Sequence, residues 1–243
     1  MEGNNIPRRA KVLVVGGGGR EHAIVDALSR SERVEKIFCA PGNAGIARQA
    51  KCVPLEDTQV DELAEFAENE GIDLTVVGPE VSLAAGIVDE FEARGLKIFG
   101  PSRAAARIES SKDFAKELMA KYNVPTAAYR TFSDSDEALA YVNAGKLPVV
   151  LKYDGLAAGK GVVVAQTLEE ADEALKDMLL DDKFGHGKVV AEEFLTGPEV
   201  SVLSFTDGKV VKPMVSSMDH KRANDHDTGL NTGGMGTIAP NPY

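Results

Sequence analysis

Two glycine-rich turns carry the residues whose types and spacing best suit chemistry with phosphate groups. The first reads GGGGREH from Gly16; it follows an apolar run at 12–15 and opens a helix-like segment. Glycines allow backbone N–H groups to approach an anion at a helix N-terminus, and Arg20 adds positive charge. The pattern therefore indicates a phosphate site, with a strand-to-helix turn that binds no ligand as the alternative.

This first turn does not fit the dinucleotide-binding fingerprint GxGxxG. Counted from Gly16, the third glycine position is Glu21, and counted from Gly17 it is His22. The next apolar run, 37–40, also ends without the acidic residue that would bind a ribose. We therefore predict neither a nicotinamide nor a flavin cofactor.

The second turn reads KYDGLAAGKGV from Lys152 and is similar to a Walker A loop. Only three residues separate Gly155 from Gly159, however, and Gly161 follows Lys160 where a Walker loop has Ser or Thr for magnesium. A Walker NTPase is therefore rejected. Because the glycines permit close approach and the lysines supply point charges, the pattern still favours a loop that covers a triphosphate over an ordinary glycine turn.

The elements that must position the first turn are those of a parallel sheet with helices between its strands. Apolar runs at 12–15, 37–40, 74–77 and 96–99 are strand candidates, each followed closely by Gly or Pro. Since parallel strands end at one edge, the turns that follow them are expected to converge on a ligand cleft there.

Two helix patterns lie between these strand candidates. In the first, apolar residues recur at helical spacing over 60–67, Thr58 and Asp61 are expected to form a capping box, and Gly71 is expected to end the helix. The second pattern runs through 83–91 and ends before Gly95. It predicts one continuous helix.

The second turn belongs to an α+β segment that follows a helix bearing residues 114–119, with Pro125 as the boundary. Helices are expected near 136–143 and 168–180, and strands at 149–152, 162–164 and 189–194 in an antiparallel sheet. Runs at 200–205 and 209–212 flank Asp207-Gly208, a strong hairpin signal. After Pro213 the sequence becomes polar and rich in glycine, with no unit that terminates the fold before Tyr243.

Composition limits the classes of function. The 243 residues are 43% hydrophobic and carry a formal charge of −11, which repels nucleic-acid phosphates. No apolar run approaches the ~18 residues of a membrane span, and the first residues lack a signal-peptide pattern, so we expect a cytoplasmic protein. Two cysteines, Cys39 and Cys52, make neither a disulfide framework nor a metal cluster.

Taken together, the blocks of sequence around these turns resemble glycinamide ribonucleotide synthetase, an ATP-grasp ligase. The resemblance starts from DGLAAGKGV at 154–162 and extends in order over nearly the whole chain. The other blocks are GGREHA at 18–23, APGNAG at 40–45, VGPE at 77–80, IFGP at 98–101, SK at 111–112, EEFL at 192–195, DHKR at 219–222, DTG at 227–229 and NTGGMG at 231–236.

The resemblance implies an α/β protein made of four segments. These are a parallel-sheet pre-ATP-grasp domain at 10–103, connecting helices at 104–123, an α+β ATP-grasp small lobe that forms a lid at 124–196, and the incomplete start of the large lobe at 197–243. ATP and Mg²⁺ or Mn²⁺ are the implied cofactors. Glycine and 5-phosphoribosylamine are the implied substrates; no nucleic acid or membrane partner is implied.

The resemblance also assigns the site residues. For ATP it implies Lys112, Lys152, Gly155, Leu156, Ala157, Ala158, Gly159, Lys160, Gly161, Glu192, Glu193, Phe194, Leu195 and Glu199, with the hinge at 192–195 holding adenine and Glu199 holding the ribose. For phosphoribosylamine it implies Gly18, Gly19, Arg20, Glu21, Asn43 and Glu80. Catalytic roles are implied for Asp219, Lys221 and Arg222, and no metal ligand is expected within this chain.

The implied reaction joins glycine to phosphoribosylamine through a glycyl phosphate, at the expense of ATP. The sequence departs from the family at Gly17, where many members have asparagine, and at Tyr153, where a small residue is common. The family continues for about as much chain again, including its magnesium ligands, so we expect doubtful activity and exposed apolar surface at 197–243. The alternatives are another ATP-grasp ligase or carboxylase and a non-catalytic nucleotide-binding fragment.

Overall fold

A computed structural model describes residues 7–155, 161–180, 187–226 and 228–243, with Leu230 and Asn231 described by their backbone alone. These residues form two compact units, one ending at Ala115 and one beginning at Lys116. The finer domain division predicted from the sequence remains a prediction. Across the described ranges, no helix is both long and apolar enough to cross a membrane.

The first unit is built on a five-stranded sheet in the order β3-β2-β1-β4-β5, in which every pair is parallel. The strands are β1 (Ala10–Gly16), β2 (Val34–Pro41), β3 (Lys51–Cys52), β4 (Leu74–Val77) and β5 (Ile98–Phe99). The helices are α1 (Gly19–Ser29), α2 (Val60–Glu70), α3 (Glu80–Ala85), α4 (Ile87–Ala93), α5 (Arg103–Ser110) and the 3-10 turn η1 (Ile46–Arg48). The predicted parallel α/β unit is confirmed.

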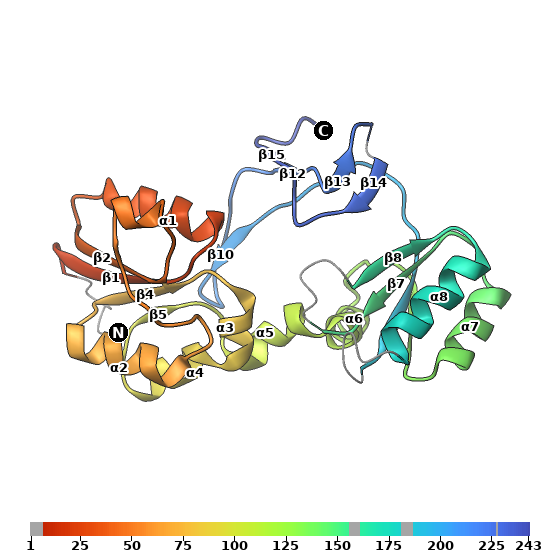
Figure 1. Cartoon of the computed structure of the whole chain (residues 1–243), viewed down its shortest axis with the longest axis horizontal. Coiled ribbons are helices and arrows are strands. Elements are labelled where there is room, and N and C mark those ends of the chain that lie inside the picture. The colour runs from red at the N-terminus through yellow and green to blue at the C-terminus, as the bar shows by residue number, and fades with distance from the viewer. Residues whose placement is uncertain (1–6, 156–160, 181–186, 227) are drawn as a thin grey trace. The chain divides into compact units, whose positions relative to one another are not determined.

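Helices cover both faces of this sheet, with α1 on one face and α2 and α4 on the other (Figure 1). Alternate residues of β1 serve the two layers: Val12 and Val14 pack with Val25 of α1, while Leu13 and Val15 pack with Leu63 of α2. All of these side chains are buried. A continuous apolar strand is what a sheet covered on both faces requires.

Three local predictions in the first unit were wrong. The capping box on Thr58 does not form, because α2 has Gln59 as its N-cap and the Gln59 side chain instead accepts a hydrogen bond from Glu56 N at 2.8 Å. The single helix predicted over 83–91 is divided into α3 and α4 at Gly86, whose φ of 93° is left-handed. The strand predicted at 96–99 begins only at Ile98, because Leu96 N donates to Phe91 O and completes the end of α4.

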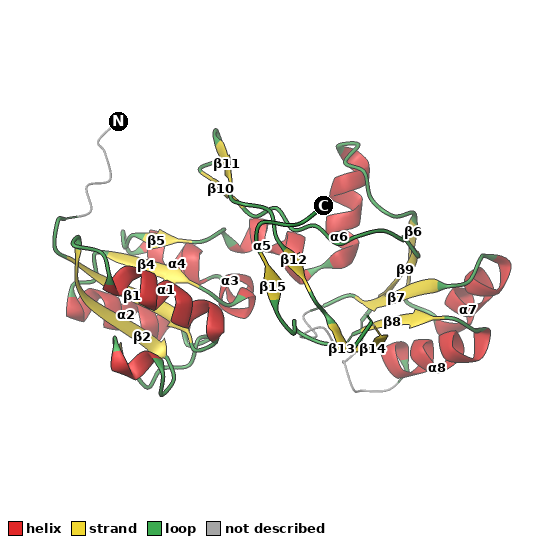
Figure 2. Cartoon of the chain, turned by 90° about the horizontal axis from the view of Figure 1, so that it is seen from above, coloured by secondary structure: helices red, strands yellow, loops and turns green. Residues whose placement is uncertain are grey.

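The second unit contains a four-stranded antiparallel sheet, as predicted, in the order β6-β9-β7-β8. Its strands are β6 (Tyr129–Phe132), β7 (Val149–Tyr153), β8 (Val162–Ala165) and β9 (Val189–Glu193). The helices α7 (Ser135–Ala144) and α8 (Leu168–Leu179) pack side by side against one face (Figure 2). Leu151 and Ala191 point into that helical layer and are buried, so Lys152 and Glu192 belong to the opposite face.

Residues 197–243 form short antiparallel pairs rather than one sheet. These are β10 (Ser204–Thr206) with β11 (Val211–Pro213), β12 (Met218–Asp219) with β15 (Thr237–Ile238), and β13 (Arg222–Asn224) with β14 (Thr228–Asn231). The predicted hairpin around Gly208 is confirmed, with four residues between its strands. The expected exposure of apolar side chains is also found, at Val200, Val202, Leu203, Phe205, Val210, Val211, Met214 and Val215.

Candidate functional site

In the first unit, the turns that follow β1, β2 and β4 meet at the carboxyl edge of the sheet. Gly42 N donates to Gly16 O at 3.2 Å, which joins the turns after β2 and β1. Arg20 Nη1 donates to Gly78 O at 2.6 Å, which joins the turns after β1 and β4. The strand order reverses its direction at β1, and the crevice beside such a reversal is where open α/β sheets bind ligands.

Glu21 is a buried carboxylate at this edge of the sheet, with 5% of its surface exposed. Its carboxylate accepts the Gly18 N–H at 2.6 Å and so closes the capping box of α1. Arg20 Nη2 lies 3.9 Å from Glu80 Oε2 and Nε lies 4.0 Å from Glu21 Oε1, so its guanidinium is held between two carboxylates. Beside this group lies the glycine-rich N-terminus of α1, a type of backbone that can approach an anion.

Asn43 fixes the shape of the turn after β2. Its Nδ2 donates to Gly17 O at 2.8 Å, and its Oδ1 accepts the N–H groups of Gly45 and Ile46 at 2.8 and 2.9 Å. The side chain therefore holds the turn in place through its amide. The structure brings Gly18, Arg20, Glu21, Asn43 and Glu80 into one neighbourhood, as the convergence of the turns predicted.

In the second unit, Lys152 of β7 and Glu192 of β9 meet on the sheet face opposite α7 and α8. Lys152 Nζ lies 2.9 Å from Glu192 Oε2. The same carboxylate oxygen lies 3.1 Å from the Nζ of Lys116, a residue of α6 (Lys112–Lys121). Glu192 is only 6% exposed. Because little water reaches this carboxylate, its charge is compensated by the two ammonium groups.

The predicted adenine hinge, 192–195, comprises the last two residues of β9 and the two that follow. Glu193 N donates to Ala128 O at 2.9 Å, which ties the end of β9 to the start of β6. Phe194 and Leu195 are 36% and 61% exposed. Of the predicted phosphate loop, Leu156, Ala157, Ala158, Gly159 and Lys160 lie outside the described residues, while Gly161 O accepts the N–H of Tyr153 at 2.8 Å.

A third group of predicted residues lines a pocket of about 440 Å³ in residues 197–243. Glu199, Asp219, Lys221 and Arg222 all contribute to its wall. Lys221 Nζ hydrogen-bonds Glu199 Oε1 and lies 3.8 Å from Asp219 Oδ2. Glu199 was predicted for the ribose and Lys221 for catalysis, so the structure places residues with different predicted roles against one another.

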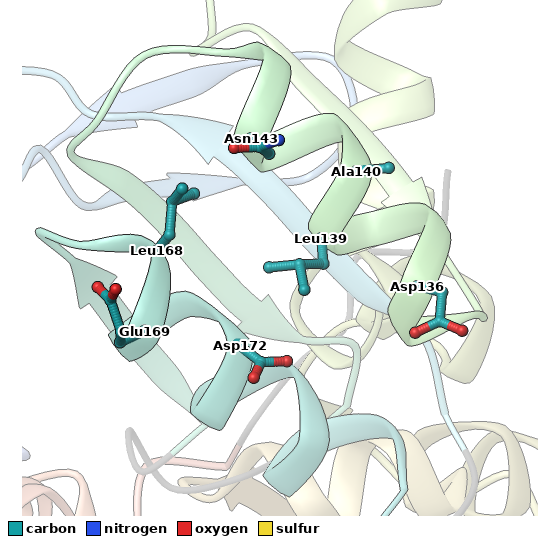
Figure 3. Close-up of a pocket in the computed structure, with 7 residues that line it drawn as sticks. All are labelled: Asp136, Leu139, Ala140, Asn143, Leu168, Glu169 and Asp172. Atoms are coloured by element: carbon teal, nitrogen blue, oxygen red, sulfur yellow. The ribbon is translucent and has the colours of Figure 1, made fainter.

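A larger pocket, of about 500 Å³, lies between α7 and α8 (Figure 3). The described residues that line it include the carboxylates of Asp136, Glu169 and Asp172, and none of them is a predicted site residue. Three acidic side chains would repel a triphosphate. We therefore do not assign the nucleotide to this pocket.

No three His, Cys, Asp or Glu side chains gather into a metal-binding group within the described ranges. A magnesium ion prefers a set of oxygen ligands around it, several of them from carboxylates, water or phosphate. The residues described here do not supply that set, and we derive no catalytic step through a metal.

Two models of one protein family match residues 10–243 of this chain. The family model described as "Phosphoribosylglycinamide synthetase, N domain" matches residues 10–109, and "Phosphoribosylglycinamide synthetase, ATP-grasp (A) domain" matches residues 110–243. The chain belongs to the phosphoribosylglycinamide synthetase family. The α/β fold predicted for this family, with an ATP-grasp region after a parallel-sheet domain, is thereby confirmed.

Curated relatives of this phosphoribosylglycinamide synthetase chain carry the name phosphoribosylamine–glycine ligase. The chain is 57% identical over 234 residues to the protein from Neisseria meningitidis serogroup B, covering 96% of this chain and 55% of that protein. It is 54% identical over 233 residues to the protein of the same name from Halalkalibacterium halodurans, covering 95% of this chain and 54% of that protein. The chain therefore spans about half the length of these relatives.

Solved structures of similar fold include family members and other ATP-grasp proteins. Phosphoribosylamine–glycine ligase from Thermotoga maritima superposes with a TM-score of 0.76 at 33% identity, covering 93% of this chain and 55% of that one. An ADP complex of N5-carboxyaminoimidazole ribonucleotide synthetase gives a TM-score of 0.71 at 18% identity over 88% of this chain and 55% of that one. The second likeness shows the fold alone.

One buried lysine beside Glu192 had no predicted role. Lys116 is 5% exposed and touches Glu192, yet no role was predicted for it. Its spacing four residues after Lys112 places both lysines on one side of α6, which is the pattern that could have indicated it.

Proposed function

We propose that the chain contributes the nucleotide-binding and phosphoribosylamine-binding parts of a cytoplasmic ligase that joins glycine to 5-phosphoribosylamine with ATP. The observation that carries the proposal is the 2.9 Å contact between Lys152 Nζ and Glu192 Oε2, at a lysine three residues before Gly155 in the sequence. An ammonium group that reaches solvent beside a glycine-rich turn suits a nucleotide phosphate. Membership of the family and the names of the curated relatives support the same assignment.

The residues then divide by ligand. Lys112, Lys152 and the turn at 155–161 would contact the ATP phosphates, residues 192–195 would hold the adenine through their backbone, and Glu199 would receive the ribose hydroxyls. Phosphoribosylamine would bind at the carboxyl edge of the first sheet, where the Arg20 guanidinium would contact its phosphate. The residues assigned to it are Gly18, Gly19, Arg20, Glu21, Asn43 and Glu80.

The proposed reaction has two steps that balance without a covalent enzyme intermediate. A carboxylate oxygen of glycine attacks the γ-phosphorus of ATP, the bond to the β-phosphate oxygen breaks, and ADP leaves. The amine of phosphoribosylamine then attacks the carbonyl carbon of glycyl phosphate, inorganic phosphate leaves, and the nitrogen loses a proton.

Side chains of residues 197–243 would serve both steps electrostatically. Lys221 and Arg222 line one pocket together with Asp219. A lysine and an arginine can stabilise negative charge that develops on a transferring phosphoryl group or on a tetrahedral intermediate. Arg222 also donates from Nη1 to Gly229 O at 2.7 Å, which orients the guanidinium within the β13–β14 hairpin.

Phosphate release by the purified chain with ATP, magnesium, glycine and freshly made phosphoribosylamine tests the proposal, with each substrate omitted in turn. A parallel titration with ADP measures nucleotide binding. Lys152→Met should abolish the ADP signal, whereas Lys176→Met, which removes a lysine paired with Asp172 on α8, should not. Release that requires all three substrates would support the ligase; ADP binding without release would support nucleotide binding alone, and absence of both would refute the proposal.

A further inference from the structure

Lys116 is a buried cation that the proposed function has not yet used. Its side chain is 6% exposed, and its Nζ donates to Thr126 Oγ1 at 2.7 Å and to Ala127 O at 3.1 Å. The ring of Tyr129 lies 5.5 Å from the same atom. Burial of an ammonium group costs free energy unless it is paired, and its charged partner here is Glu192.

Lys116 and Lys152 share a single oxygen of Glu192. Their Nζ atoms lie 3.1 and 2.9 Å from Oε2, so two positive charges meet one negative charge. The two ammonium groups differ in their access to solvent: the Lys116 side chain is 6% exposed, and the Lys152 side chain is 30% exposed. The surplus positive charge of the group therefore reaches solvent through Lys152.

We propose that Lys116 is a positioning residue that neutralises Glu192 and thereby keeps a surplus positive charge at the Lys152 ammonium, where it attracts a nucleotide phosphate. Without Lys116, Glu192 and Lys152 form an isolated pair with no net charge, and a phosphate must compete with the carboxylate for Lys152. This inference rests on the proposed nucleotide site. It adds a residue from α6 that acts through Glu192 rather than on the nucleotide.

A purely structural role for Lys116 predicts a different pattern of binding. Its bonds to Thr126 and Ala127 connect α6 to the segment that leads into β6. If those bonds were its whole purpose, their loss would disturb the adenine hinge and the phosphate contacts together. An electrostatic role acts on the phosphates alone, so the comparison of ADP with adenosine separates the two.

The experiment measures the affinities of the full 243-residue chain for ADP and for adenosine. Lys116→Met should weaken ADP binding by about tenfold, the effect of one charge-assisted hydrogen bond, and leave adenosine binding unchanged. Lys116→Arg keeps the charge and should restore most of the ADP affinity. Lys121→Met removes an exposed lysine from the same helix that contacts the ring of Tyr122, and it should alter neither affinity.

A second variant, Glu192→Gln, provides an independent test in case Lys116→Met folds poorly. Glu192→Gln removes the shared carboxylate, so addition of Lys116→Met to this variant should change ADP affinity no further. Equal loss of ADP and adenosine binding in Lys116→Met, no loss of either, or a further tenfold loss in the Glu192→Gln background would overturn the inference alone. If the unchanged chain binds no ADP, the proposed function fails and the inference falls with it.

Discussion

Gly78 lies against the buried carboxylate of Glu21 so closely that no side chain fits between them. A Cβ added at Gly78 would lie 1.9 Å from Glu21 Oε1 and 2.5 Å from Cδ. Ordinary contact begins near 3.4 Å, so in Gly78→Ala the carboxylate must retreat by about 1.5 Å. That movement breaks the 2.6 Å hydrogen bond from Gly18 N to Glu21 Oε2.

The expected cost combines two effects. Overpacking of a tight site costs about 1–3 kcal/mol, and the loss of a hydrogen bond to a buried charge costs about 1.5–3 kcal/mol. Because the retreat relieves part of the overpacking, we expect Gly78→Ala to lower the free energy of unfolding of the first unit by about 2–4 kcal/mol. Hydrogen exchange of the β1 and β4 amides measures this loss of stability in the first unit, and it does not require the whole chain to unfold together.

Two further variants assign the cost to Glu21. Gly19→Ala adds the same methyl group where no atom lies within 4 Å, so it should leave exchange unchanged or slower. In a Glu21→Ala background the clash has no partner, and Gly78→Ala should then cost little. The reasoning is refuted if Gly78→Ala costs less than about 0.5 kcal/mol alone, or costs as much with Glu21 removed as with Glu21 present.

Three other groups give separate tests. Burial raises the pKa of the Cys39 thiol from 9.0 to about 12. The unfolded thiol therefore ionises first, and the free energy of unfolding should fall as pH rises above 9.0. Denaturation at two pH values measures this slope, which Cys39→Ala should remove. The backbone N–H groups of Val210 and Lys209 lower the pKa of Asp207, so the hairpin should lose this support as pH falls below the ordinary 3.8, and NMR amide shifts of both residues should follow that titration. Arg94 contacts Glu90, Glu68 and Asp61, and Glu90 contributes most to raising the pKa of Arg94. Arg94→Met should lower the melting temperature, and this decrease should be smaller in about 0.5 M salt. A decrease that salt does not change would argue against an electrostatic cause.

The main strands and the sheet types were predictable because they depend on strong local patterns. Uninterrupted apolar runs such as 12–15 occur where a sheet is covered on both faces, and the observed burial of β1 matches that requirement. The convergence of the turns followed from the parallel arrangement alone. The strand β6 was missed because four residues with mixed polarity, Tyr129–Phe132, pair only at an edge of the sheet.

Other errors came from features that sequence periodicity does not contain. The helical spacing of apolar residues continues through 83–91, and only the left-handed φ of Gly86 divides it into two helices. Lys116 shares its helix with the exposed Lys121, and only the position of Glu192, 76 residues later in the sequence, distinguishes it. Contacts between distant segments therefore decided what local pattern left open.

The parallel order of the first sheet also has a practical use for labelling. The turn after every strand of this sheet lies at the carboxyl edge, while the connections that lead into β2, β4 and β5 lie at the amino edge. Glu32, in the connection before β2, is exposed. A fluorophore or an affinity handle attached at Glu32 would project from the edge of the sheet opposite to the predicted phosphoribosylamine site.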